Sequence, residues 1–301
     1  MGASLGNWEY LSQSNDSADC VPEEDRFKFV DDLSTLEIIN LLTIGLSSLS
    51  MKHHVPSDIP QHGQFIHSEN LKSQEYLQKI NSWTESKKME ISDKKTKAMI
   101  FNFTDKHQFT TRLNLKGTNI EVVDKMKILG TIINNQLSWD ENCNEIIKKV
   151  NSRMQLIREL KSFGASNQEM SHFWILFCRS VLEQSCVVWG SSLTQENIDN
   201  LERTQKTFAK LVLKEKYKNY ENALSILNLE NLENRRKILT KRFAINGIMT
   251  NTLTDLFPMS HKEHEMKKRN NEAYHVNFAH TERLRKASII TMQKLLNQQN
   301  D

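Results

Sequence analysis

Alternating apolar and polar positions predict a strand near the start of the chain. Residues 26–34 read Arg-Phe-Lys-Phe-Val-Asp-Asp-Leu-Ser, with Phe27 and Phe29 between charged neighbours. A period of two is typical of a half-buried strand. We therefore expect a strand over Phe27–Val30 that pairs with a second strand, with Asp31 and Asp32 at the turn that ends it.

Further segments up to about residue 135 mix both periods. Prolines and glycines separate them and indicate loops. The pattern predicts, in chain order, a helix over Leu33–Leu49, a loop over Met51–Phe65, a helix over Ser68–Lys88, a strand over Thr96–Phe103, a hairpin over Leu113–Val122 with its turn at Lys116–Asn119, and a strand over Lys127–Ile133.

From Trp139 onward the spacing is helical throughout. One apolar stripe runs through Ile146, Val150, Met154 and Ile157. Ser166 followed by Glu169 predicts a capping box, and Thr194 predicts the N-cap of a later helix. The buried sides expected for these two helices are Met170, Phe173, Phe177 and Val181 in the first, and Leu201, Phe208, Leu211 and Val212 in the second. An amphipathic stretch at Leu284–Leu296 ends the chain.

Basic residues form a row on the helix that follows Thr194. Arg203, Lys206, Lys210 and Lys214 fall within a narrow arc opposite its apolar side, over about three helical turns. Such a row suits the phosphates of a nucleic acid, although a solvated helix face explains it without any function. A second basic cluster follows at Arg235–Lys237 and Lys241–Arg242.

Charge is distributed unevenly along the chain. Residues 201–301 hold 19 Lys and Arg against 11 Asp and Glu, whereas residues 1–200 hold 21 against 26. An acidic front and a basic back suit a protein that holds cations at one end and an anionic polymer at the other, and a solvated helical surface gives the same count.

Cysteine and histidine spacing does not indicate a structural metal. The four cysteines lie far apart, so we expect neither a disulfide framework nor a zinc ribbon, and we expect a reducing compartment. The histidines from His261 to His280 have no Cys partners at tight spacing, and a basic tail explains them better. No apolar run approaches the roughly 20 residues of a membrane span. The sequence therefore predicts a soluble intracellular protein, in the nucleus or the cytoplasm.

The adjacent carboxylates of Asp31 and Asp32 are the strongest candidates for chemistry. Two such groups at a strand end repel each other unless a cation or a basic partner lies with them. Mg²⁺ prefers oxygen ligands and takes only one or two from protein, which leaves room for phosphates. The alternative is ordinary, because an Asp-Asp pair often only caps a turn.

Taken in order, these segments resemble the C-terminal part of a reverse transcriptase from a non-LTR (LINE-type) retrotransposon. No single motif is specific, and the resemblance rests on their order and spacing across nearly the whole chain. The motifs are Gly2-Ala3-Ser4-Leu5-Gly6, similar to the back half of the Pro-Gln-Gly-x-x-x-Gly loop; Phe29-Val30-Asp31-Asp32, similar to the aromatic-x-Asp-Asp turn; Trp83, Met89, Lys95-Thr96, Met99 and Phe101; Lys127-Ile128-Leu129-Gly130 with Leu137 and Trp139, similar to the primer grip and thumb entry; Leu201-Glu202-Arg203-x-Gln205-Lys206; and Leu232-x-x-Arg235-Arg236.

The resemblance implies an α+β fold: an incomplete polymerase palm of antiparallel strands and helices, followed by an all-helical thumb-like and C-terminal region. The boundaries expected are residues 1–110 for the second half of the palm, 111–135 for a hairpin and primer-grip-like strand, 136–250 for the helical thumb-like region, and 251–301 for a basic tail with a terminal helix.

The same resemblance implies roles for individual residues. The implied reaction is DNA synthesis on an RNA template, so the implied partners are an RNA template, a DNA primer or hybrid duplex, and a dNTP. The roles are Mg²⁺ binding and catalysis for Asp31 and Asp32, protonation of the leaving pyrophosphate for Lys95, a nucleotide and template loop for Gly2, Ser4 and Gly6, a primer grip for Leu129 and Gly130, and nucleic-acid binding for Arg203, Lys206, Lys210, Arg235, Arg236 and Lys241.

The chain departs from the family in one respect that matters for activity. The family's first catalytic aspartate and its fingers precede the Pro-Gln-Gly loop, and the present chain starts after them. We therefore expect an N-terminally truncated enzyme that is inactive alone. A non-catalytic module that binds RNA or a hybrid duplex, and a non-functional relic of a retroelement, are the alternatives.

Overall fold

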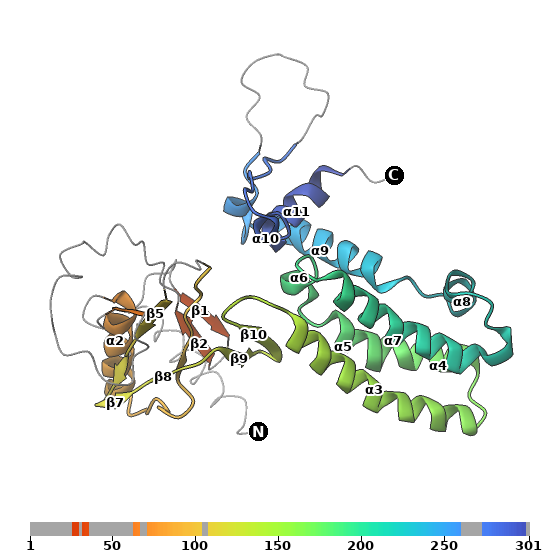
Figure 1. Cartoon of the computed structure of the whole chain (residues 1–301), viewed down its shortest axis with the longest axis horizontal. Helices are drawn as coiled ribbons and strands as arrows, with labels where there is room; N and C mark the ends of the chain where they lie inside the picture. The colour runs from red at the N-terminus through yellow and green to blue at the C-terminus, as the bar shows by residue number, and fades with distance from the viewer. Residues whose placement is uncertain are drawn as a thin grey trace, which may run out of the picture. The chain divides into compact units, whose positions relative to one another are not determined.

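The computed structural model describes residues 26–29, 32–35, 63–66, 71–103, 108–259 and 273–298. The chain divides into two compact units, Met1–Met126 and Lys127–Asp301 (Figure 1). Helices and short strands both occur in the described residues, so the expected α+β class is confirmed at that level. No helix in these ranges is long and apolar enough to cross a membrane.

The strand predicted at Phe27 is present and forms a hairpin. Strand β1 (Arg26–Phe29) pairs antiparallel with β2 (Asp32–Thr35), and Phe29 lies opposite Asp32. The helix predicted from Leu33 is wrong at its start, because residues 33–35 pair with β1 instead. The remainder of that predicted helix, and Asp31 itself, lie outside the described residues.

Two strand pairs of the first unit are parallel, which the expected antiparallel palm did not include. Strand β3 (Gly63–Ile66) pairs with β5 (Gln108–Thr111), and β4 (Lys97–Ala98) pairs with β8 (Glu121–Val122). Helix α2 (Lys72–Ser86) lies between β3 and β5 in the chain, and a crossover of this kind is what parallel pairing requires. The predicted loop over residues 51–65 therefore gives way to a strand at residue 63, and the predicted strand over residues 96–103 shortens to two residues.

The hairpin predicted over Leu113–Val122 is confirmed in part: the chain reverses at Lys116–Gly117, but residues 121–122 of its predicted second strand pair with β4 instead. Strand β6 (Asn114–Leu115) pairs antiparallel with β7 (Thr118–Asn119). The side-chain amide of Gln74 fixes α2 to it: Nε2 donates to the Asn114 carbonyl at 2.9 Å, and Oε1 accepts from the Asn114 N–H at 2.8 Å. This buried amide supplies the backbone pairing that a neighbouring strand would give.

The single strand predicted over Lys127–Ile133 is wrong, because this segment is a hairpin. Strand β9 (Lys125–Ile128) pairs with β10 (Thr131–Asn134). Leu129 and Gly130 form the turn with φ of 47° and 86°. Two consecutive positive φ angles are typical of the two-residue turns that match strand twist. The sequence pattern that predicted one strand therefore runs through the two residues at which the chain turns back.

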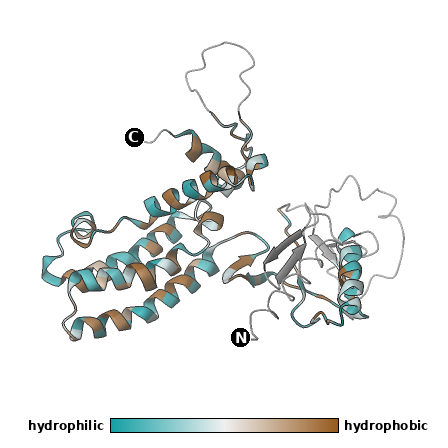
Figure 2. Cartoon of the chain, turned by 180° about the vertical axis from the view of Figure 1, so that it is seen from behind, coloured by the Kyte–Doolittle hydropathy of each residue, from teal (hydrophilic) through white to brown (hydrophobic). Residues whose placement is uncertain are grey.

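Helices make up the second unit after β10, and the part between residues 140 and 250 contains no strand, as predicted. The long helices each carry both hydrophobic and hydrophilic residues (Figure 2). The helical elements of this unit are α3 (Asp140–Ser162), α4 (Asn167–Phe173), the π-helix η4 (Trp174–Arg179), α5 (Ser180–Glu183), α6 (Cys186–Trp189), α7 (Gln195–Leu213), the 3₁₀ turn η5 (Lys214–Lys216), α8 (Tyr220–Leu227), α9 (Leu232–Met249), the 3₁₀ turn η6 (Thr254–Leu256), α10 (Glu282–Arg285) and α11 (Ser288–Asn297).

The main core lies among α3 to α9. The predicted stripe on α3 is buried, and the predicted capping box is present: Ser166 Oγ accepts from the Glu169 N–H, and Glu169 accepts from the Ser166 N–H. In the next segment the buried side differs from the prediction. It runs through Met170, Trp174, Cys178 and Leu182, whereas Phe177 is 51% exposed. A π-helix has more residues per turn than an α-helix, so the spacing used for the prediction does not apply there.

The terminal helix packs onto other helices of the second unit. Helix α11 contacts α9 and α6, and Ala244, Phe257 and Met292 form a second small core. Gln293, which is fully buried, donates from Nε2 to the Leu256 carbonyl and accepts the Asn277 N–H at Oε1. These bonds hold the ends of the described C-terminal segments onto α11.

Candidate nucleic-acid interface

Helix α7 presents the predicted basic row on its exposed face. The Thr194 hydroxyl caps its N-terminus by accepting the Asn197 N–H at 3.2 Å. Leu201 and Phe208 are fully buried on the opposite side, while Arg203, Lys206 and Lys210 are exposed. Lys214 follows the last helical residue with a φ of 47° and is exposed. The helix therefore directs three of the four predicted cations away from the core.

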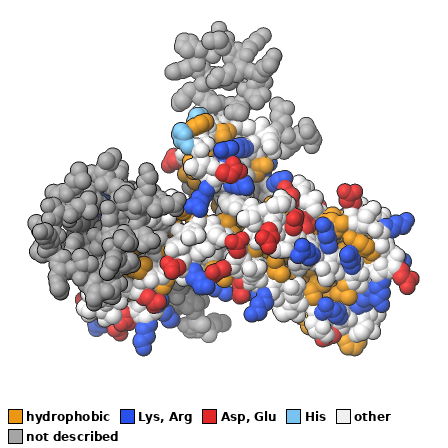
Figure 3. Space-filling view, in the orientation of Figure 1, with side chains coloured by type: hydrophobic (Ala, Val, Ile, Leu, Met, Phe, Trp, Pro, Cys, Tyr) orange, Lys and Arg blue, Asp and Glu red, His pale blue; other side chains and the backbone are white. Residues whose placement is uncertain are grey.

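Two tyrosines from the segment after α7 lie beside these cations. The Lys206 ammonium lies 5.0 Å from the ring centroid of Tyr220, and the Lys210 ammonium lies 5.5 Å from that of Tyr217. Both distances are within the range of cation–π attraction. Figure 3 shows Lys and Arg side chains among hydrophobic ones on the face of the helical unit seen there. The candidate site is thus a row of cations with aromatic rings next to it.

The cations of this surface have no acidic partner within the described part of the chain. Within those residues no ion pair forms at Arg203, Lys206, Lys210 or Lys214, nor at Lys216 and Lys218 in the following loop. Surface lysines on other helices, in contrast, pair with a glutamate four residues before them. The examples are Lys79–Glu75, Lys149–Glu145 and Lys237–Glu233. Glu215 is the only acidic residue between positions 203 and 218. This segment therefore carries a local excess of positive charge, as phosphate binding requires. We call Arg203, Lys206, Lys210 and Lys214, together with Tyr217 and Tyr220, the α7–α8 surface.

A buried polar network lies beneath the α7–α8 surface. Glu202, only 9% exposed, accepts the Tyr220 hydroxyl at 2.5 Å and the Glu233 N–H at 3.0 Å. Gln205 is fully buried, donates to the Tyr220 oxygen at 2.9 Å and to the Glu230 carbonyl at 2.8 Å, and accepts from the Trp174 indole at 3.1 Å. Burial and the hydrogen bond to Glu202 raise the pKa of Tyr220. The Tyr220 ring is consequently held in one place beside Lys206.

Lys161 brings a further cation to the C-terminal end of α7. Its ammonium donates to the carbonyl oxygens of Leu211 and, at 2.9 Å, of Val212. A lysine at these carbonyls satisfies groups that have no partner within the helix and complements the helix dipole. Burial, with a smaller contribution from Lys214, lowers the pKa of Lys161. Lys161 therefore acts as a structural cap.

Arg235 is ion-paired and Arg236 is buried, so neither is exposed as the cations of α7 are. Arg235 makes two hydrogen bonds to Glu183, at 2.9 and 3.2 Å, and these bonds raise its pKa. Arg236 is 4% exposed, its pKa is lowered by burial, and its buried Nη2 has no hydrogen-bond partner. Lys241 donates to the Gln298 carbonyl at 2.9 Å. Unlike the cations on α7, these three side chains are therefore buried or already bonded within the protein.

The other predicted site residues have varied positions. Leu129, which is 48% exposed, and Gly130 form the β9–β10 turn, and the side chain of Gln184 donates to the Leu129 carbonyl at 3.2 Å. Lys95 is exposed two residues before β4. Asp32 is the first residue of β2. Gly2, Ser4, Gly6 and Asp31 lie outside the described residues, and within those residues no group of three or more His, Cys, Asp or Glu side chains could hold a metal ion.

The sequence patterns did not identify Tyr217 and Tyr220 as parts of this surface, nor Glu202 and Gln205 as the buried network beneath it. Glu202 and Gln205 belong to the Leu201–Lys206 motif, which does not predict their burial. They are buried because α7 contacts α4, α8 and α9, and the spacing of residues within one helix cannot predict such contacts. One signal was available, because Tyr217 stands between Lys216 and Lys218 in an otherwise polar loop. Aromatic residues interleaved with cations are typical of single-strand binding surfaces.

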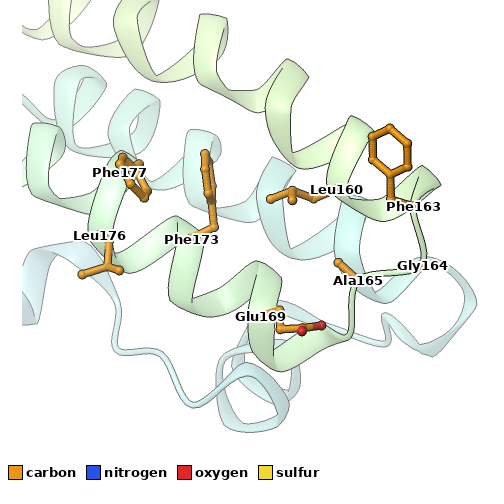
Figure 4. A pocket seen from close by; sticks show the side chains of 8 residues that line it. All are labelled: Leu160, Phe163, Gly164, Ala165, Glu169, Phe173, Leu176 and Phe177. Carbon is orange, nitrogen blue, oxygen red and sulfur yellow. The ribbon is translucent and has the colours of Figure 1, made fainter.

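A second surface feature is an apolar groove between α3 and the α4–η4 segment (Figure 4). Its volume is about 520 Å³, and it is lined by Leu160, Phe163, Gly164, Ala165, Glu169, Phe173, Leu176 and Phe177. Glu169 is the only charged residue among them, and its carboxylate is engaged by Ser166 in the capping box. The groove therefore lacks the cations that a nucleic acid needs.

Comparison of the chain with models of protein families, with curated proteins and with solved structures gave no match.

Proposed function

We propose that this chain corresponds to the C-terminal part of a reverse transcriptase from a non-LTR retrotransposon, and that its helical unit binds RNA or a hybrid duplex through the cations of α7. The observation that carries the binding function is the exposed row of Arg203, Lys206 and Lys210, which has no acidic partner among the described residues. Phosphates would supply the missing negative charge and release their counterions on binding.

The hairpin of β1 and β2 supports the polymerase part of the proposal. Asp32 opens β2 opposite Phe29, and only Val30 and Asp31 connect the two strands in sequence. An antiparallel hairpin with acidic residues at its connection agrees with the aromatic-x-Asp-Asp motif. In the family, two Mg²⁺ ions would activate the primer hydroxyl and stabilise the leaving pyrophosphate.

Within the described residues, which do not include Asp31, no two-metal site is complete. Asp31 and Asp32 offer hard oxygen ligands, which suit Mg²⁺, but a pair of ions needs carboxylates from a further strand. The described residues add no such group. We therefore derive no catalytic step, and we assign this chain a binding function supported by its own residues.

Binding measurements with the whole chain test the proposal. A labelled RNA–DNA hybrid should bind at 50 mM salt and dissociate as salt rises, and the Arg203→Ala, Lys206→Ala, Lys210→Ala triple variant should bind it more weakly with a shallower salt dependence. Lys79→Ala is the matched control, because Lys79 is paired with Glu75 at 2.7 Å in the other unit. Absence of binding, or binding that does not respond to salt, would refute the proposed function.

A further inference from the structure

We propose that the α7–α8 surface prefers single-stranded polynucleotides to duplexes, because an unpaired base can stack on Tyr217 while the neighbouring lysines hold the phosphates. This inference rests on the proposed function and names the form of nucleic acid that the same site takes. Duplex bases are already stacked on one another, so their faces are not open to a protein ring, and this surface would contact mainly the phosphates of a duplex.

The position of Tyr217 carries the inference. The residue lies in the short connection between α7 and α8, just after η5, and its ring is half-buried against the main core. Lys210 extends its ammonium over the ring at 5.5 Å. The ring is therefore anchored by packing on the core, and a flexible lysine side chain lies over it.

A base and a phosphate together can replace this lysine contact. Stacking of a base on an aromatic ring contributes more free energy than a cation–π contact at an exposed site. When Lys210 moves from the ring to a phosphate, it keeps an electrostatic partner and leaves the ring to the base. The exchange is favourable for a single strand and unavailable to a duplex.

Nearby residues make the surface rigid enough for this role. The Tyr220 hydroxyl is fixed by Glu202 and Gln205, so the second ring stays in place beside Lys206 at 5.0 Å. Lys216 and Lys218 flank Tyr217 in sequence and are both exposed. The phosphates on either side of a stacked base would thus have cations within reach, an arrangement typical of surfaces that bind single strands.

Fluorescence anisotropy with the whole chain tests the inference. The probes are labelled 20-nucleotide RNA and DNA single strands of one mixed sequence, and each of them annealed to its complement. Tyr217→Leu should weaken binding of single strands about 5- to 100-fold, the effect of removing one stacking ring, and change duplex binding less than 2-fold. Tyr217→Phe keeps the ring and should bind like the parent chain. RNA and DNA single strands should respond alike, because stacking does not use the 2′-hydroxyl.

The outcomes separate this inference from the proposed function. Suppose that the Arg203, Lys206, Lys210 triple variant loses binding to all probes. If Tyr217→Leu then changes the binding of no probe, or weakens the binding of single strands and duplexes equally, the single-strand preference is wrong and phosphate binding stands. If the parent chain binds no probe, both are wrong. Should Tyr217→Leu fail to fold by circular dichroism, Tyr217→Trp decides: it should tighten single-strand binding only, and an unchanged affinity would overturn the inference.

Discussion

The Tyr220 hydroxyl donates a 2.5 Å hydrogen bond to Oε2 of Glu202, a carboxylate that is only 9% exposed. The other oxygen of this carboxylate accepts the Glu233 N–H in the first turn of α9. One buried side chain of α7 therefore fixes the start of α8 and the start of α9. A negative charge near a helix N-terminus also interacts favourably with the positive end of the helix dipole. Glu202 therefore stabilises the packing of three helices.

Replacement of Glu202 should destabilise the protein. Glu202→Ala leaves the Glu233 N–H without its partner. It also removes the carboxylate whose charge most favours the ionised form of the buried Arg236 guanidinium. We expect a loss of about 2–3 kcal/mol in the free energy of unfolding, measured by urea denaturation. Glu202→Gln keeps an acceptor oxygen and should lose about half as much.

The control for this prediction is Glu215→Ala. Glu215 is exposed, has no ion pair among the described residues, and should change the free energy of unfolding by less than about 0.5 kcal/mol. Equal stability of Glu202→Ala and Glu215→Ala would show that the network contributes nothing to folding.

Arg235 should contribute to stability and not to nucleic-acid affinity. Its two hydrogen bonds to Glu183 join α9 to α5, and both side chains are largely buried. Arg235→Ala should lower the free energy of unfolding by about 1–2 kcal/mol, because Glu183 keeps Arg179 at 3.5 Å as a second partner. Hybrid binding by the folded variant should match that of the parent chain.

Lys237→Ala is the matched control for Arg235→Ala. Lys237 lies two residues further along α9 in a surface pair with Glu233, and surface pairs contribute little, so its loss should cost less than about 0.5 kcal/mol. A weaker hybrid affinity of Arg235→Ala without a loss of stability would instead support the contact with phosphates that the sequence pattern predicts.

Local signals predicted much of the helical unit. Ser166 and Glu169 form the capping box that their spacing indicates, Thr194 caps α7, and the stripe from Ile146 to Ile157 is buried. These features depend on residues three or four positions apart within one helix. The exposed basic row of α7 belongs to the same class, since one helical period places both its buried and its exposed face.

Non-local contacts explain what the sequence could not predict. The pairing of Arg235 and the burial of Arg236 depend on Glu183 and on the core around Cys186, more than 45 residues earlier in the chain. Their charge alone therefore predicted an exposed nucleic-acid contact. The Leu129–Gly130 turn interrupts a pattern that reads as one strand, because backbone torsion and not hydropathy decides where the chain reverses. The offset at Phe177 follows from the π-helix, whose wider turn no helical period anticipates.

The cysteines of the helical unit should be unreactive. Burial raises the pKa of Cys143 to about 12 and those of Cys178 and Cys186 to about 11. At pH 8 only roughly one thiol in a thousand of the latter two would be ionised, and the thiolate is the reactive form. In a Cys20→Ser chain, Ellman's reagent should therefore modify none of the three at pH 8 within minutes, and all three in 8 M urea.

The same pKa shifts predict a pH dependence of stability. Unfolded thiols ionise near pH 8.5 whereas the buried ones stay neutral, so the free energy of unfolding should fall as pH rises from about 8.5 toward 11. Replacement of the three cysteines by alanine should remove this part of the decline. Rapid modification of any one of them in the folded chain would mean that its helix opens readily.

Binding to a hybrid duplex should depend steeply on salt. If four to six phosphates are contacted, affinity should fall by roughly two to three powers of ten between 50 and 200 mM salt. The triple variant of Arg203, Lys206 and Lys210 should lower the slope of log K against log salt by about 2 to 3, as three lost phosphate contacts require. An unchanged slope with reduced affinity would mean that these side chains act through folding and not through phosphates.

The last prediction concerns DNA synthesis by the polypeptide of residues 1–301. We expect no primer extension above background on an RNA template with Mg²⁺ and dNTPs, although the hybrid binds. Under the proposed function, Asp31 and Asp32 would supply the carboxylates of one turn. Two ions about 4 Å apart need a further carboxylate from another strand, because one adjacent pair cannot fix them both.

Asp31→Ala separates binding from catalysis in this experiment. The variant should bind the hybrid with unchanged affinity and salt slope, because the proposed phosphate contacts are all on α7. Extension by the parent chain that disappears in Asp31→Ala would show that residues 1–301 assemble a working metal site, and the proposal of a binding function alone would then be wrong. Extension that persists in Asp31→Ala would come from a contaminating polymerase, which a heat-inactivated sample and a second purification would identify.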